Sequence, residues 1–137
     1  MTFSQLEKVA DIIDLIQQHE TLIDQVDSGI KTSKIDAIPG GSNPDPHRIE
    51  QLLIRKENAL AKLPQLRRVR DGYMPHVRKT IEEATARISK PSVRIRMQLI
   101  MKMRYEQGRS WQEIQHITGI NLPKDLVLKY LEVQHGS

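Results

Sequence analysis

Basic side chains gather in the second half of this 137-residue chain, where they could hold a polyanion. Residues 65–137 contain 14 Lys and Arg and 7 Asp and Glu, a net charge of +7, whereas residues 1–64 contain 7 and 10, a net charge of −3. Lysine and arginine release counterions when they bind nucleic-acid phosphates. This asymmetry therefore favours a polyanionic partner for the second half, with a merely solvated basic surface as the alternative.

Residue patterns typical of catalysis or metal binding are missing from the sequence. The chain has no cysteine, which excludes disulfides and zinc sites built on thiolates. Neighbouring Glu82 and Glu83 would point in different directions on a helix, so they are unsuited to a carboxylate pair. The five histidines stand singly, at positions 19, 47, 76, 116 and 135. We therefore expect no enzyme activity, no catalytic residue, no cofactor and no metal site.

The basic half contains three expected helices, between Pro91 and about Val133. Gly108 is expected to end the first, because glycine adopts the left-handed conformation that closes a helix. Ser110 and Glu113 have the spacing of a capping box, in which each side chain satisfies a free backbone N–H at the start of a helix. The second helix is therefore expected to begin at Ser110.

A second break separates this short helix from the last one. Residues 118–121 interrupt the pattern, and Asn121 is expected to cap the third helix, with Pro123 in its first turn. Trp111 is expected to be largely buried between the three helices, as the largest apolar group of so small a core. A helix, a turn containing glycine and a further helix form the outline of a DNA-binding helix-turn-helix.

Candidate contact residues follow from this outline, because a recognition helix places its N-terminal residues at base edges in the major groove. Val127 and Leu128 are expected on its exposed side, which leaves open that this weakly charged helix docks a protein instead. The DNA-binding candidates on the helix and its flank are Asn121, Lys124, Asp125, Leu128 and Lys129. The candidates for phosphate contact are Arg94, Arg96, Lys102, Arg104 and Arg109, the first four on the exposed side of the first helix and Leu99 on its buried side.

The first half of the chain reads as a pair of long helices. Apolar residues from Phe3 to Val26 form two adjacent stripes, so more than one neighbour should cover this helix. One neighbour could be the next helix of the same chain and the other a second copy of the protein, so we expect an oligomer, most simply a homodimer. Ser28-Gly29 is expected to close the helix, and residues 30–44 to form a loop.

The second long helix is expected to begin at Asp45-Pro46, an N-cap carboxylate followed by a proline in the first turn. Pro64 predicts a kink or a restart near residues 61–63, because proline removes a hydrogen bond inside a helix. Asp71-Gly72, just before Pro75, is a further candidate break.

The stretch RYEQGRSWQEIQHITGIN, residues 104–121, resembles the promoter-reading domain of sigma factors. Together with the coiled-coil-like first half and the Pro-Gly-Gly at 39–41, it also resembles the small phage regulators of the ArpU/RinA type. These control late transcription in phages of Gram-positive bacteria. The resemblance implies a transcription regulator of a phage or mobile element that binds DNA as a dimer or higher oligomer in the host bacterial cytoplasm. RNA polymerase or another host protein is a further candidate partner.

The sequence thus predicts an all-α protein, with an N-terminal long-helix hairpin or coiled coil and a C-terminal sigma-like helix-turn-helix. We expect the oligomerisation region at residues 1–88 and the helix-turn-helix domain at residues 89–137. No apolar run approaches the roughly 20 residues that a membrane span needs. Two alternatives are a phage-encoded inhibitor that binds a host polymerase or defence nuclease, and a small DNA-packaging (terminase) subunit.

Overall fold

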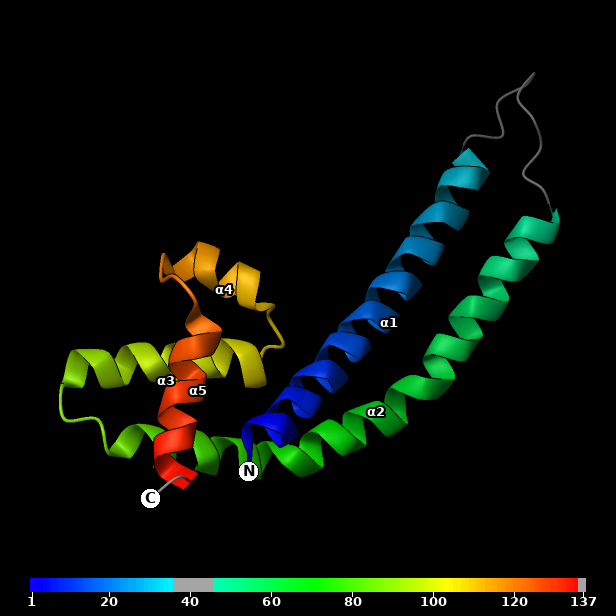
Figure 1. The fold of residues 1–137 in the computed structure, drawn as a ribbon. Helices are drawn as coiled ribbons and strands as arrows, with labels where there is room; N and C mark the ends of the chain where they lie inside the picture. Colours follow the sequence, from blue (N-terminus) through cyan, green and yellow to red (C-terminus); the bar gives the residue numbers. More distant parts are fainter. Residues whose placement is uncertain (36–45, 136–137) are drawn as a thin grey trace. The chain divides into compact units, whose positions relative to one another are not determined.

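The computed structural model describes residues 1–35 and 46–135, with the side chains of residues 1–29 and 46–131. Within this part of the chain all regular structure is helical, as predicted (Figure 1). The helices are α1 (Phe3–Ile35), α2 (Pro46–Ala86), α3 (Pro91–Tyr105), α4 (Trp111–Thr118) and α5 (Pro123–His135). None of the helices in the described ranges is both long and apolar enough to cross a bilayer.

Helix α1 is longer than expected. It continues through Ser28 and Gly29 to Ile35, so the predicted end at Ser28-Gly29 is wrong. A glycine inside a helix costs only about 1 kcal/mol relative to alanine, which the turns on either side outweigh. Most of the expected loop, including the Pro-Gly-Gly at 39–41, lies outside the described residues, as does Asp45. Pro46 is the first residue of α2, as predicted.

Helix α2 runs without a break from Pro46 to Ala86 (Figure 1). The chain does not restart at Pro64 and does not break at Asp71-Gly72, so the expected breaks are wrong, while a kink at Pro64 stays a prediction. Buried residues lie on either side of these positions, including Leu63 and Val77 at 3% and 0% exposure. Because packing of an apolar face supplies most helix stability in proteins, it overrides the local cost of a proline.

The chain folds as two compact units. One unit comprises residues 1–14 and 69–137, and the other comprises residues 15–68. The first turns of α1 and the last part of α2 belong with α3, α4 and α5 because they contribute to the same core. Each long helix is thus divided between the two units.

The core of the first unit is built from aliphatic and methionine side chains around one tyrosine. Burying one such side chain contributes about 1.5–3 kcal/mol, and flexible methionines fill irregular gaps between helices. Val127 of α5 is fully buried, so its expected exposure is wrong, while Leu99 of α3 is 46% exposed although a buried position was expected. The buried members are Leu6, Val9, Ala10, Ile13, Val77, Ile81, Ala84, Ile88, Met97, Ile100, Met101, Met103, Tyr105, Ile114, Val127 and Leu131.

The second unit contains the remainder of α1 and the first part of α2. Its ion pairs join Lys56 to Asp27 at 2.6 Å and Arg67 to Glu20 at 3.9 Å. Its buried apolar side chains in the described ranges are Ile16, Val26, Ala59 and Leu63. This is a small core for two long helices. Several large apolar side chains stay on the surface, since Leu15, Leu53, Ile54 and Leu60 are each at least 40% exposed.

Candidate nucleic-acid interface

The connection between α3 and α4 is fixed by local signals that the sequence shows. Gly108 has a φ of +71°, and the next N–H, that of Arg109, donates to the Met103 carbonyl at 2.9 Å. Ser110 caps α4, because its Oγ accepts a hydrogen bond from the Glu113 N–H at 3.1 Å. The Glu113 carboxylate accepts from the Ser110 hydroxyl at 3.3 Å. The predicted start of α4 is therefore confirmed.

The turn between α4 and α5 is closed by Gly119, with a φ of +71° and an N–H that donates to the Gln115 carbonyl at 2.8 Å. Asn121 does not cap α5; its Oδ1 accepts from Gln115 Nε2 at 3.3 Å. The Leu122 carbonyl accepts from the N–H groups of Asp125 and Leu126, at 3.1 and 3.3 Å. Asn121 thus lies one residue too early to cap. Leu122 has a φ of +52°, a left-handed conformation that costs a leucine about 1–2 kcal/mol.

Helix α5 turns one face inward and presents a polar face to solvent. Pro123, Val127 and Leu131 are buried at the four-residue spacing that lines one side of a helix. Leu128, one of the predicted contact residues, is half-buried beside them. The other four predicted contact residues are exposed, namely Asn121, Lys124, Asp125 and Lys129.

Two of the five predicted phosphate contacts are engaged inside the protein instead of lying on an exposed face. Arg94 donates from Nε and Nη2 to the Ile88 carbonyl, at 3.1 and 2.8 Å. Arg104 is only 15% exposed and pairs with Glu7. A guanidinium forms such two-pronged contacts readily because its donors are fixed in a planar fork.

The other three predicted phosphate contacts stay accessible. Arg96 and Lys102 are exposed on α3, and their side chains make no hydrogen bond or ion pair with another residue whose side chain is described. Arg109 is 43% exposed, with Nη1 3.7 Å from the Glu113 carboxylate and Nε donating to Gln107 Oε1 at 2.9 Å. Arg96 and Lys102 are therefore the cations of α3 that are available to a ligand.

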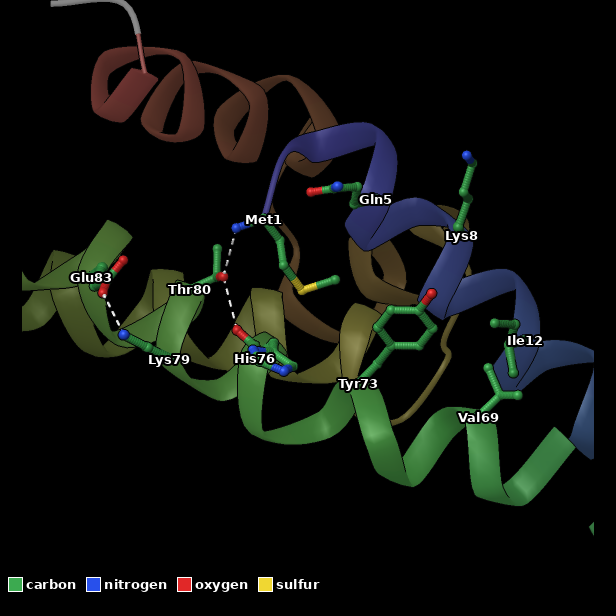
Figure 2. Close-up of a pocket in the computed structure, with 10 residues that line it drawn as sticks. All are labelled: Met1, Gln5, Lys8, Ile12, Val69, Tyr73, His76, Lys79, Thr80 and Glu83. Atoms are coloured by element: carbon green, nitrogen blue, oxygen red, sulfur yellow. Dashed lines mark hydrogen bonds and ion pairs between the residues drawn. The ribbon is translucent and has the colours of Figure 1, made fainter. Parts of the chain in front are cut away.

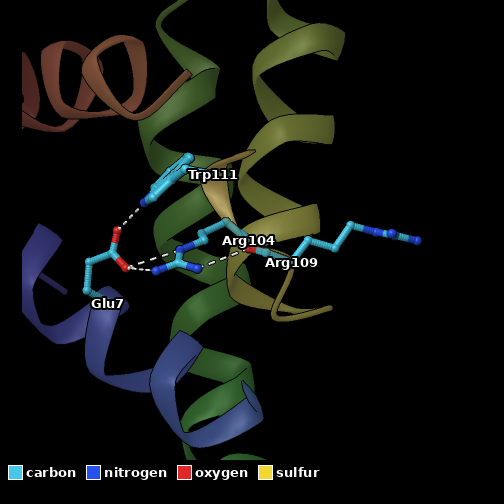
Figure 3. A network of polar contacts seen from close by, with 4 residues as sticks. All are labelled: Glu7, Arg104, Arg109 and Trp111. Carbon is cyan, nitrogen blue, oxygen red and sulfur yellow. Dashed lines mark hydrogen bonds and ion pairs between the residues drawn. The ribbon is translucent and has the colours of Figure 1, made fainter. Parts of the chain in front are cut away.

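A polar network joins α1 to the α3–α4 connection (Figure 3). Glu7 Oε2 accepts from Arg104 Nε at 3.1 Å and Nη2 at 2.5 Å, while Oε1 accepts from Trp111 Nε1 at 3.0 Å. Arg104 Nη1 also donates to the Arg109 carbonyl at 3.0 Å, and its guanidinium lies 5.1 Å from the Trp111 ring centre. Trp111 is half-buried and packs against the core of the first unit, and its hydrogen bond to Glu7 adds α1 to its neighbours.

Tyr105 is the largest fully buried side chain, and it lies edge-on to Trp111 with ring centres 6.2 Å apart. Its hydroxyl is buried without a hydrogen-bond partner among the described residues. Burial raises the pKa of the phenol far above its ordinary value, and the negative charge of Glu7 raises that pKa further. Glu7 is close enough to act through its charge, but the geometry is not that of a hydrogen bond.

A groove of about 590 Å³ lies between the first turns of α1 and the last part of α2 (Figure 2). Thr80 Oγ1 donates to the His76 carbonyl at 2.9 Å and accepts from the Met1 amino group at 3.2 Å, while Lys79 lies 4.0 Å from Glu83. The polar groups that line the groove thus largely bind each other. In the described parts of the chain, no three His, Asp or Glu side chains come together as metal ligands would.

Comparisons of the chain with protein-family models, with curated proteins and with solved structures found no match.

Proposed function

We propose that this protein is a DNA-binding transcription regulator of a phage or mobile element, with α4 and α5 as a helix-turn-helix. The observation that carries the proposal is the packing of α3, α4 and α5, each of which contacts the other two. Within this packing α5 buries Val127 and exposes Lys124 and Lys129. A recognition helix needs this combination, because one face must hold the helix to its scaffold while the other enters the major groove.

Charge on α3 supports contact with the DNA backbone. The helix contains four basic residues and no acidic one. Arg94 and Arg104 are engaged internally, so Arg96 and Lys102 are the residues proposed to contact phosphates, with Arg109 beside them. Such contacts hold a protein on the duplex without reading its sequence, and they make affinity depend strongly on salt.

The exposed side chains at the start of α5 have the chemistry to read base edges. Lysine donates to the guanine O6 and N7, an asparagine amide pairs with adenine, and a carboxylate accepts from the cytosine amino group. Lys124, Asn121 and Asp125 match these three modes, and Lys129 adds a cation one turn further along. Leu128 is half-buried and offers an apolar contact for a thymine methyl group.

The proposal includes a homodimer formed through the second unit. Leu53, Ile54 and Leu60 of α2 are exposed by 43%, 50% and 47%, beside a core too small to cover them. A two-fold dimer would bury these residues and would place two recognition helices on two half-sites of the DNA.

Direct measurement of DNA binding tests the proposal. Fluorescence anisotropy with labelled duplexes should show binding that weakens steeply between about 50 and 200 mM salt. Lys124→Ala with Lys129→Ala should reduce affinity and sequence preference, whereas Arg55→Ala with Lys62→Ala, an equal loss of charge on exposed positions of the second unit, should change neither. An absence of duplex binding at the lowest salt would refute the proposal.

A second candidate function, docking of a host polymerase or defence nuclease, is favoured by one surface feature. Ile95 and Leu99 lie four residues apart on α3 and are exposed by 65% and 46%. Exposed apolar pairs of this kind mark contact surfaces when they cluster. Ile95→Glu should abolish activity in cells without changing DNA affinity if a protein docks there. A ring-shaped oligomer in solution would instead favour the DNA-packaging subunit.

A further inference from the structure

A second hollow, of about 350 Å³, lies where the end of α2 and the start of α3 meet α5. Three cationic residues line it: Arg87, Lys90 and Lys129. No carboxylate of a described side chain lines it, and the three cations form no hydrogen bond or ion pair with another side chain that the structure describes. Among the described side chains, nothing compensates the positive charge of this pocket, whereas Glu7 neutralises that of Arg104.

The walls between these cations are apolar. Ala84 and Ile88 are almost fully buried, at 4% and 8% exposure, while Val93 and Tyr130 are half-buried and pack against the same core. The pocket thus offers hydrocarbon and aromatic surface with cations around it. Its volume falls within the range of about 300–1,000 Å³ that is typical of sites for small molecules.

The backbone around the pocket is held in place by hydrogen bonds that do not involve the cations. The two bonds from Arg94 to the Ile88 carbonyl tie α3 to the end of α2, and the Ile88 N–H donates to the Thr85 carbonyl at 3.1 Å. The Thr85 hydroxyl in turn donates to the Ile81 carbonyl at 2.7 Å. A pocket with walls fixed in this way loses little freedom when a ligand enters.

We propose that this pocket binds a small amphipathic organic acid, whose apolar body lies against Val93, Ile88 and Tyr130 and whose carboxylate meets the cations. Hydrogen bonds between a carboxylate and Arg or Lys are stronger than those between neutral groups. Contact with the apolar walls would distinguish such an acid from an inorganic anion. The inference goes beyond the proposed DNA-binding function and does not rest on it.

Titration calorimetry with two carboxylates of different apolar shape, octanoate and 4-phenylbutyrate, tests the proposal in the absence of DNA. We expect saturable binding of one ligand per chain to at least one of them. Acetate, which lacks the apolar body, and the neutral amide of the acid that binds should each bind at least about tenfold more weakly. NMR shifts should concentrate on Val93, Lys129 and Tyr130.

Variants separate binding in this pocket from attraction to a basic protein in general. Arg87→Gln with Lys90→Gln should weaken binding by about tenfold or more, and so should Ser89→Glu, which places a carboxylate on the lining. Arg55→Gln with Lys62→Gln removes the same charge from exposed positions outside the pocket and should leave binding unchanged. Failure of both acids to bind, equal binding of acid and amide, or equal loss in the control would overturn the proposal.

Discussion

Gly108 lies directly against Ile13 of α1, so closely that a Cβ atom on the glycine would be 2.5 Å from Ile13 Cγ2 and 3.1 Å from Ile13 Cβ. The same residue has a φ of +71°, which ends α3 and directs the chain toward α4. Only glycine satisfies both conditions, because it has no Cβ to clash and adopts positive φ freely. The contact fastens the α3–α4 connection to the first helix of the chain.

Gly108→Ala should therefore destabilise the protein more than the same change at another left-handed glycine. We expect a loss of about 2–4 kcal/mol, the sum of a left-handed alanine and of overpacking against a branched side chain. Gly119→Ala is the matched control, because Gly119 has the same φ and nothing within 4 Å of its Cβ position. It should lose only about 1–2 kcal/mol in the same denaturant titration. Equal losses would mean that the Ile13 contact relaxes freely.

Replacing Glu7, the acid of the polar network that joins α1 to the α3–α4 connection, should also destabilise the first unit. Glu7→Gln removes the charge that pairs with Arg104, and both side chains are less than 20% exposed. We expect a loss of about 1–3 kcal/mol in thermal unfolding, with a change in Trp111 fluorescence because the indole loses a charged acceptor. Glu20→Gln, which breaks a half-exposed pair with Arg67 at 3.9 Å, should cost no more than about 0.5 kcal/mol. Equal losses of stability in the two variants would mean that the pair of Glu7 with Arg104 contributes no more than an exposed ion pair.

The buried phenol of Tyr105 should make the protein sensitive to alkali. Its pKa is raised on folding, so above a pH of about 10 the unfolded chain loses a proton that the folded chain retains. The unfolded state then binds fewer protons, and the free energy of unfolding falls as the pH rises. Tyr105→Phe should be close to neutral at pH 7, because the hydroxyl has no partner to lose. A variant with the same alkaline slope as the wild type would contradict this assignment.

The features that sequence alone predicted are those with short-range causes. Ser110 with Glu113, the glycine at 119 and Pro46 act through neighbouring residues, so their spacing was sufficient. The pairing of Glu7 with Arg104 could not be predicted, because 97 residues separate them and nothing local marks either as a partner. Helix α2 shows the reverse case, in which local proline signals are real but tertiary packing overrides them.

The second kind of error concerned which side of a helix faces the core and which faces solvent. Val127 and Leu99 were assigned to the wrong sides because each has apolar neighbours in the sequence, so the pattern alone does not single out the face that the core covers. Most of the candidate contact residues on α5 are nevertheless exposed as predicted, because charged residues seldom occupy a core.

The second unit should associate with a copy of itself. Light scattering at micromolar concentration should give about twice the 15.8 kDa of one chain, because two helices with so small a shared core leave Leu53 and Leu60 uncovered. Leu53→Glu with Leu60→Glu should shift the mass to that of a monomer, while Lys62→Glu on the same helix should not. A wild-type mass of 15.8 kDa would show that these leucines face solvent.

The last prediction separates DNA-backbone contact by α3 from base contact by α5. Arg96→Ala with Lys102→Ala should weaken binding to all duplexes alike, and each lost phosphate contact should remove about 0.9 from the slope of log affinity against log salt. Lys124→Ala should instead cost about 1–3 kcal/mol for the preferred duplex and relax the preference at one position. Arg94→Ala should act through stability, because its guanidinium holds the Ile88 carbonyl.

Two outcomes of these measurements distinguish the proposed partners. If Arg96→Ala with Lys102→Ala changes the slope of log affinity against log salt and Lys124→Ala changes the preferred duplex, both helices contact DNA as proposed. If neither set matters while Ile95→Glu abolishes activity in cells, α3 contacts a protein through its exposed apolar pair. Val127→Asp cannot serve in this test, because Val127 is fully buried and the substitution would unfold the core before any partner is lost.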